Sequence, residues 1–257
     1  MLSGFVKAQG VESKKYLFYY DAISAAAVLV MMPNNDTFTA PCGYTQYQGI
    51  ALAPIRGSLH QVTTQQIKLM SLLLQVLEDK HPHHSFCLHP LLSDLRPFQW
   101  HNYGKKDKPR YSIHIAYSGI INLTSYSDYG AFFNTIRSSR RQDYRKAVRC
   151  GLIATESHDM DIFIDLYKQT FLRQNIILND AEQNYIREFL GNLMDANLAK
   201  LHVCCLECDE PTNAAVFITH NKRSYYLFGA ANPEYRSLGG STYLLLRQIK
   251  ECFETKV

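Results

Sequence analysis

Residues 230–242, which read AANPEYRSLGGST, contain the sharpest local signal in the chain. A predicted strand ends in two alanines, turn-forming residues follow, and a helical pattern begins after a pair of glycines. The first N–H groups of a helix attract anions, and glycine lets a phosphate approach the backbone closely. The stretch therefore predicts an anion-binding turn or an ordinary strand-to-helix connection. It lacks the lysine of a Walker motif, which argues against a nucleoside triphosphatase.

The neighbouring residues extend this pattern in both directions. Residues 201–207 and 214–219 are apolar and strand-prone, and the turn-forming residues 209–213 separate them, so they predict a hairpin. Residues 225–231 predict a third strand, and residues 241–253 predict an apolar helix.

A similar order of elements occurs near the start of the chain. Residues 16–20 and 25–32 predict a second hairpin, and residues 65–80 predict a helix with one apolar stripe. The sequence AAVLV of residues 26–30 resembles the AAVFI of residues 214–218. This match indicates two related lobes, although a chance likeness between two apolar hairpins is the alternative.

We expect the two lobes to span residues 1–104 and 105–257, with the boundary at the short basic loop 104–110. Each lobe is expected to be an α+β (α/β) unit with a mixed, mostly antiparallel sheet flanked by helices. Residues 129–150 predict one long helix that ends at Gly151, and residues 160–174 predict a further amphipathic helix.

Composition limits the classes of protein to which the chain can belong. A hydrophobic content of 46% with 19% charged residues favours a packed core and argues against disorder. The net charge of +4 is only a weak indication of an anionic partner. Seven cysteines without a regular framework, and no secretory leader, predict a cytoplasmic protein. The longest apolar run, residues 25–32, is too short to cross a bilayer.

A basic repeat lies within the predicted helix 129–150. Arginines recur every four residues at Arg137, Arg141, Arg145 and Arg149, which places them along one face. Arg141 and Arg145 are candidate substrate-binding residues because such a face can hold phosphates on tRNA, a nucleotide-linked sugar or a lipid headgroup. A solvated helix face explains the same pattern equally well.

Two further sets of residues are candidates for binding an acceptor substrate. Arg96, Trp100 and Tyr103 stand among polar residues, where aromatic and arginine side chains often anchor ligands. The alternative, which we favour, is a plug between the lobes with Trp100 in the core. Arg173 and Gln174 line an acceptor groove or cap the end of their helix.

The glycine-rich turn within residues 230–242 resembles the donor-binding loop of GNAT acyltransferases. That loop has Arg or Gln, two residues, Gly, any residue and then Gly or Ala, and RSLGGS at residues 236–241 matches it except for Ser241 in the last place. The resemblance implies that backbone amides hold the donor pyrophosphate. It implies the following donor-binding residues: Phe228, Gly229, Ala230, Arg236, Leu238, Gly239, Gly240, Ser241 and Thr242.

The whole chain resembles the Fem-like branch of this superfamily, whose members have two GNAT lobes. The resemblance rests on segments 44–49, 94–103, 139–151, 166–174 and 225–246, of which only the last is fairly specific. A complete lobe continues into a fifth strand and a final helix, so we expect this chain to be truncated at its C terminus. Such a truncation puts catalytic competence in doubt.

The Fem-like resemblance implies transfer of an acyl or aminoacyl group to an amine. The donor is acyl-CoA, such as acetyl-CoA, or aminoacyl-tRNA, and the sequence leaves that choice open. The implied acceptor is a small molecule or a precursor in cell-envelope or surface-polysaccharide synthesis, with tRNA as a further partner. The alternative is a catalytically inactive GNAT-like module that binds an anionic ligand or a protein.

The chemistry of such enzymes needs few side chains. Backbone N–H groups near residues 228–230 would polarise the donor carbonyl, and Tyr226, Glu234 and Tyr235 are candidate proton carriers because they lie close to the loop. We expect no metal and no tightly bound cofactor. Cys204 and Cys205 lie on an apolar strand, where cysteine packs as a small hydrophobic residue.

Overall fold

The computed structural model describes residues 7–9, 11–21, 25–32, 44, 47, 50–206 and 210–256. The chain forms two compact units that divide between Ile120 and Ile121, and each contains an antiparallel sheet flanked by helices. The expected α+β class is therefore confirmed. Within the described ranges, none of the helices combines the length and the apolar character that a bilayer crossing needs.

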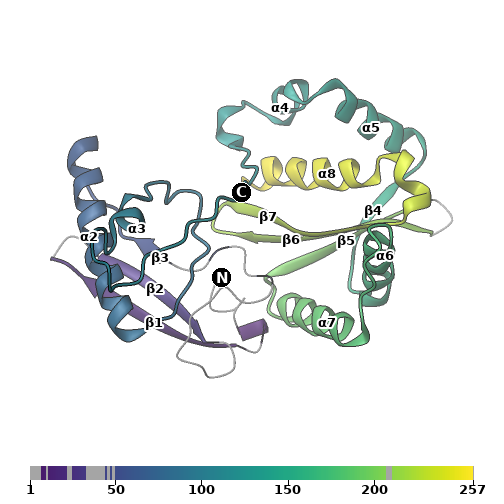
Figure 1. Ribbon diagram of the computed structural model, residues 1–257. Coiled ribbons are helices and arrows are strands. Elements are labelled where there is room, and N and C mark those ends of the chain that lie inside the picture. Colours follow the sequence, from purple (N-terminus) through teal and green to yellow (C-terminus); the bar gives the residue numbers. More distant parts are fainter. Residues whose placement is uncertain are drawn as a thin grey trace. The chain divides into compact units, whose positions relative to one another are not determined.

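The N-terminal unit is a three-stranded antiparallel sheet covered by a long helix (Figure 1). Its elements are β1 (Glu12–Tyr19), β2 (Ala25–Met32), β3 (Ile50–Leu52), α2 (Leu59–Lys80) and α3 (Arg96–Trp100). The predicted hairpin 16–32 forms as β1 and β2. Helix α2 begins earlier than expected because Ser58 and Gln61 form a capping box at its N terminus.

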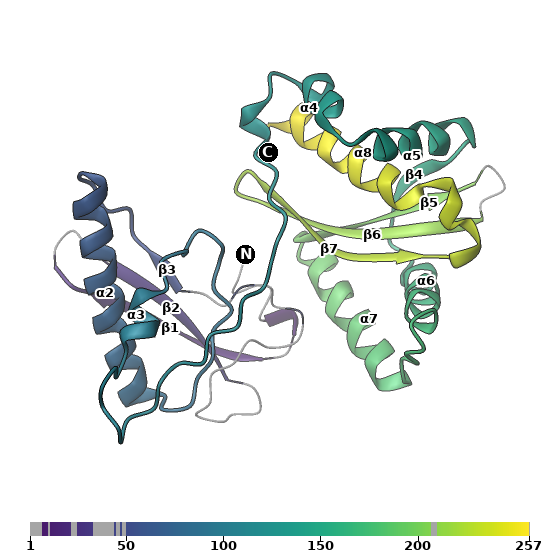
Figure 2. The same cartoon turned by 45° about the horizontal axis from the view of Figure 1, so that its top comes forward.

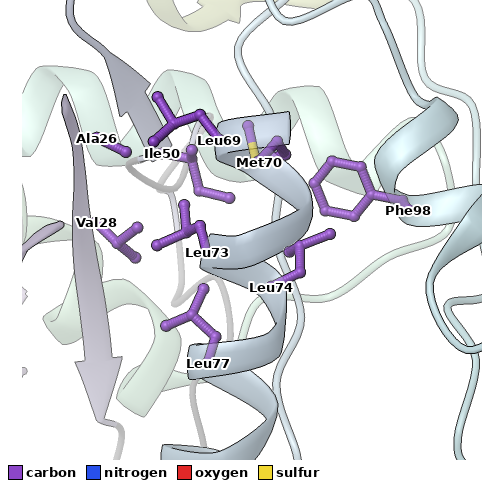
Figure 3. Close-up of a cluster of buried hydrophobic side chains, with 9 residues drawn as sticks. All are labelled: Ala26, Val28, Ile50, Leu69, Met70, Leu73, Leu74, Leu77 and Phe98. Atoms are coloured by element: carbon purple, nitrogen blue, oxygen red, sulfur yellow. The ribbon is translucent and has the colours of Figure 1, made fainter. Parts of the chain in front are cut away.

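The core of this unit lies between α2 and the sheet (Figure 3). Leu69, Leu73 and Leu77, spaced four residues apart on α2, point to strand β2, which carries Ala26 and Val28. A second set on the helix faces α3, where Leu74 approaches Phe98. One amphipathic helix therefore joins the sheet to α3 through two neighbouring stripes.

The C-terminal unit is a four-stranded antiparallel sheet in the order β4-β5-β6-β7, with helices on both faces (Figures 1 and 2). Its strands are β4 (Ile153–Ser157), β5 (Ala199–Cys205), β6 (Pro211–His220) and β7 (Arg223–Ala231). Its helices are α4 (Tyr129–Thr135), α5 (Ser138–Arg149), α6 (Met160–Leu172), α7 (Asp180–Asp195) and α8 (Gly240–Thr255), and short 3-10 helices span Leu123–Ser125 (η2) and Pro233–Leu238 (η3).

The two faces of this sheet bury different side chains. Phe228 of β7 packs against Phe163 and Phe189 of α6 and α7 on one face. Cys204 and Phe217 pack with residues of α8 and α5 on the other face, so Cys204 is a small hydrophobic core residue, as expected. Helix α8 lies directly over the sheet, and α4 and α5 lie beside α8 (Figure 2).

The prediction of one helix over residues 129–150 is wrong, because Ile136 and Arg137 are extended and separate α4 from α5. Phe132 packs with the far end of α8, and Tyr144 stacks near its start at Tyr243. Twelve residues of straight helix would place these two rings about 120° apart, so the break lets both face α8. The predicted stop is confirmed, since Gly151 has a φ of 72° and forms a Schellman motif with Leu152.

Two parts of the predicted pattern fall partly outside the described residues. These are the segment 44–49, of which the structure describes only Tyr44 and Tyr47, and the turn before β6, where residues 207–209 are not described. Strand β4, by contrast, is a fourth strand that the sequence pattern did not predict.

Candidate functional site

The candidate site begins at the open edge of β7. In the described part of the chain, β7 pairs only with β6, so its other edge has no partner strand. The register shifts by one residue between Val216 and Phe217, which leaves Leu227 as an extra residue in β7. A bulge of this kind bends a strand and increases its twist.

The backbone of Gly229 faces this open edge. The Asn232 N–H donates to the Thr212 carbonyl of β6 at 2.9 Å, whereas the Ala231 N–H turns away and donates to the Thr170 hydroxyl of α6 at 2.8 Å. Backbone groups alternate in direction along an antiparallel pair. The N–H of Gly229, two residues before Ala231, therefore points outward.

Tyr226 covers Gly229 on the α8 side of the sheet. A β-carbon on Gly229 would lie only 1.6 Å from the Tyr226 hydroxyl oxygen, so glycine alone fits beneath the ring in this position. The ring also packs against Phe217, with centroids 5.5 Å apart. Partial desolvation raises the pKa of the Tyr226 phenol above its ordinary value, while the residue as a whole stays 47% exposed.

The connection from β7 to α8 is a structured turn. Asn232 begins it by accepting a hydrogen bond from the Glu234 N–H at 3.0 Å, and the 3-10 helix η3 follows. Gly239 then adopts the left-handed conformation, with a φ of 81°. A β-carbon there would lie 2.6 Å from the backbone carbonyl oxygen of Asp143, so α5 packs tightly against the turn.

Helix α8 begins without a side-chain cap at Gly239. The N–H groups of Gly240, Ser241 and Thr242 stand in the first turn, where an α-helix offers no internal acceptor. A positive helix end with such N–H groups is suited to bind a phosphate. Ser237 and Ser241, on either side of the two glycines, are exposed.

The predicted donor-binding residues differ in exposure: some are accessible beside the turn, and others pack in the core. Arg236 and Ser241 are exposed beside the turn, and Thr242 is half-buried. The Phe228 and Ala230 side chains are core residues, so only their backbone could meet a donor. Leu238 packs against the cluster under α8 and acts structurally. Of the candidate proton carriers, Glu234 is exposed and Tyr235 is half-buried.

The basic repeat is shorter than its sequence predicts. Arg137 lies in the break before α5, and the Arg141 side chain donates to the Asn134 carbonyl. Arg140 pairs with Asp143 at 3.0 Å. Arg145 and Arg149 are exposed on α5, the helix that touches the turn through Asp143. Two of the four repeated arginines thus form an exposed basic face on this helix.

Arg173 and Gln174 follow α6 and are exposed. The N–H of Arg173 closes the helix by donating to the Gln169 carbonyl at 3.3 Å, which is the capping role that we weighed against substrate binding. Thr170, one turn earlier, holds the end of β7 through Ala231. The end of α6 therefore stands close to the start of the turn.

The other predicted acceptor residues lie in the N-terminal unit. Trp100 is 55% exposed and lies outside the core of its own unit, which α2 and the sheet fill, and its predicted place in a plug between the lobes stays a prediction. Arg96 pairs with Asp94 at 2.6 Å and lies over the Trp100 ring. Tyr103 is 72% exposed. Both rings border a cavity of about 150 Å³ between α2 and α3.

A half-buried carboxylate anchors the segment that carries these rings. Glu78 of α2 accepts hydrogen bonds from His101 at 2.7 Å and from Asn102 at 3.0 Å, and Lys108 lies 3.3 Å away. Burial raises the pKa of Glu78, but the bonds from Asn102, His101 and Lys108 outweigh it and the net shift is downward. Sequence analysis missed this network because its members lie on separate segments.

Comparisons with known proteins agree with this geometry. Residues 131–257 match the family described as "Acetyltransferase (GNAT) domain". Among solved structures, the chain is similar to the one described as "Crystal structure of FemX", with a TM-score of 0.60 and 12% identical residues, over 99% of this chain and 79% of that chain. The TM-score of 0.60 shows a shared fold, and the 12% identity carries the comparison no further. No curated protein matches the chain.

Proposed function

We propose that the chain is a Fem-like member of the GNAT superfamily and that it transfers an acyl or aminoacyl group to an amine acceptor. The proposal rests on one observation. The open edge of β7 at Gly229 is followed, after one short turn, by the start of α8, which has no side-chain cap. One end offers a backbone N–H to a carbonyl, and the other offers N–H groups to phosphates.

The reaction follows from these two binding elements. The acceptor nitrogen attacks the donor carbonyl carbon, and the Gly229 N–H stabilises the negative charge that develops on the carbonyl oxygen. The bond to the thiol of CoA, or to the ribose oxygen of tRNA, then breaks. The nitrogen loses a proton to a base, and the leaving thiolate or alkoxide takes one up. Holding both reactants in place supplies much of the rate enhancement.

The candidate proton carriers suit different steps of this reaction. The Tyr226 hydroxyl lies over Gly229 and carries its proton at neutral pH, so we assign it to donating a proton to the leaving group rather than to accepting one. Glu234 is exposed at the turn, where its carboxylate can accept a proton through water. Tyr235 neighbours it and has no separate role in the proposal.

Two donors satisfy the same geometry. Acyl-CoA and aminoacyl-tRNA both present phosphate and an activated carbonyl, and the exposed Arg145 and Arg149 on α5 would favour the larger polyanion. The acceptor would be an amine on a small molecule or on a cell-envelope precursor. As separate candidate sets for acceptor binding we propose Arg96, Trp100 and Tyr103 in the N-terminal unit, and Arg173 and Gln174 at the end of α6 in the C-terminal unit.

A catalytically inactive binding module remains the second candidate function. The observation in its favour is that internal packing by Asp143 and Asn213 explains Gly239 and Gly240 without any ligand. Such a module would bind an anionic ligand or a protein at the same helix start but would not transfer a group.

Thermal unfolding with and without acetyl-CoA tests the proposal. A ligand at about one hundred times its Kd adds about 2.7 kcal/mol of stability. Thr242→Glu puts a carboxylate at the third position of α8, where it favours the helix but repels a phosphate, so this variant should fold and lose the shift. Gln61→Glu makes the same kind of change at the third position of α2 and should keep the shift.

Titration with tRNA at two salt concentrations separates the two donors. Binding to tRNA that weakens steeply with salt, without a shift from acetyl-CoA, would assign aminoacyl-tRNA as the donor. If acetyl-CoA stabilises Thr242→Glu as much as it stabilises the original chain, the donor does not bind at the start of α8. Binding of either ligand without release of its acyl group to any amine tested would favour the binding module.

A further inference from the structure

Asn213 of β6 lies directly beneath the start of α8. Its side chain is 2% exposed, and its Nδ2 donates a hydrogen bond to the Ser241 hydroxyl oxygen at 2.9 Å. A β-carbon on Gly240 would lie 1.9 Å from the Asn213 Oδ1, so the amide packs against the backbone of the first helical turn. Asn213 therefore contacts both residues that open the helix.

The Asn213 side chain is only half satisfied. Its Oδ1 is buried and has no hydrogen-bond partner within the described part of the chain. An unpaired buried carbonyl oxygen lowers stability, and an apolar side chain of similar size would avoid that loss. What an apolar side chain could not supply is the N–H that reaches Ser241.

This arrangement sets the direction of the Ser241 hydroxyl. A serine oxygen that accepts a bond from Nδ2 keeps its own hydrogen available, and that hydrogen is not given to Oδ1, which has no partner. Ser241 is exposed. Its hydroxyl hydrogen can thus point outward beside the N–H groups of the first turn.

We propose that Asn213 is a positioning residue for the donor. It holds the first turn of α8 in place and turns the Ser241 hydroxyl outward as an additional hydrogen-bond donor to a phosphate. The inference rests on the proposed function for the phosphate itself. It also gives a role to Ser241, which stands where the GNAT loop has glycine or alanine.

A double-mutant cycle tests whether Asn213 acts through Ser241. The Kd for coenzyme A is measured by calorimetry for Asn213→Ala, Ser241→Ala and the double variant. Each single change should raise the Kd about five- to tenfold, which corresponds to the loss of one hydrogen bond. The Kd of the double variant should be no higher than that of the single variant with the larger effect. Effects that add fully, or an unchanged Kd in Asn213→Ala, would overturn the proposal.

Thr219→Ala serves as the matched control. Thr219 lies on the same strand and also loses a side-chain hydrogen bond, to Ser224, but it is exposed. Its variant should bind coenzyme A as the original chain does. Equal weakening by this control would assign the effect to β6 as a whole and not to Asn213.

Hydrogen exchange in the free protein separates this inference from the proposed function. Asn213→Ala should speed amide exchange at residues 240–246 while the rest of the sheet exchanges as before. If the original chain binds no coenzyme A, acyl-CoA fails as the donor, and the exchange data still decide whether Asn213 holds the helix. Unchanged exchange at 240–246 would overturn the positioning role, whatever the binding result.

Discussion

The backbone carbonyl of Asp143, in the middle of α5, occupies the space where a β-carbon on Gly239 would lie. The separation would be 2.6 Å, and Gly239 has a φ of 81°. Two independent constraints therefore demand glycine at the turn before α8. They also link α5 to the turn before α8 through direct packing.

Replacing Gly239 should destabilise the protein and weaken donor binding together. Gly239→Ala has two costs. An alanine in the left-handed conformation costs about 1–2 kcal/mol, and its β-carbon would clash with the Asp143 carbonyl oxygen, a backbone atom that cannot rotate away. We expect the free energy of unfolding in urea to fall by about 2 kcal/mol or more. Gly191→Ala on α7 is the control, because its β-carbon meets open space and should stabilise the helix by up to about 1 kcal/mol.

Removing the hydroxyl of Thr170 should loosen the end of β7. The hydroxyl accepts a hydrogen bond from the Ala231 N–H at 2.8 Å and lies 2.9 Å from the Leu166 carbonyl. Thr170→Val keeps the shape but leaves that N–H without its partner, so the free energy of unfolding should fall by about 1 kcal/mol. Thr255→Val loses a comparable bond to Glu251 at an exposed helix end and should change stability by less than about 0.5 kcal/mol. Equal losses of unfolding free energy in both variants would show that the hydrogen bond from Thr170 to β7 does not contribute to stability.

Glu78 should make the N-terminal unit sensitive to acid. Its folded pKa lies below the ordinary value of 4.5, because the bonds from Asn102, His101 and Lys108 outweigh the effect of burial. The carboxylate therefore stabilises the fold above its unfolded pKa, and this contribution is lost as the pH falls through the folded pKa. Glu78→Gln should lower the free energy of unfolding by about 1–3 kcal/mol at neutral pH and by less at an acidic pH below the folded pKa of Glu78. Urea unfolding at both pH values, followed by fluorescence of Trp100, measures the difference, and a loss independent of pH would contradict it.

Local patterns predicted the elements that local interactions determine. Apolar, strand-prone runs separated by turn residues predicted both hairpins, and the apolar helix after the turn forms as Gly240–Thr255. Gly151 predicted the end of α5 because a left-handed residue stops a helix wherever it stands. The same patterns missed β4, whose residues are mostly exposed and gain their partner from β5, more than forty positions later in the chain.

Other features were decided by packing between distant segments. The sequence predicted one helix over residues 129–150, but contacts of Phe132 and Tyr144 with α8 require a break at Ile136. It also favoured Trp100 in a plug between the lobes, and within the N-terminal unit α2 and the sheet fill the core without it. In both cases the structure depends on contacts with a distant element. Local sequence periodicity carries no information about such contacts.

The sequence by itself determined that residues 236–241 form a glycine-rich turn between a strand and a helix, because the glycines and the change of period are local. Only the tertiary structure decided why each glycine is needed. Gly229, Gly239 and Gly240 lie against Tyr226, Asp143 and Asn213 respectively. Two of these contacts join segments far apart in the chain, so they exist only once β6, α5 and α8 have packed together.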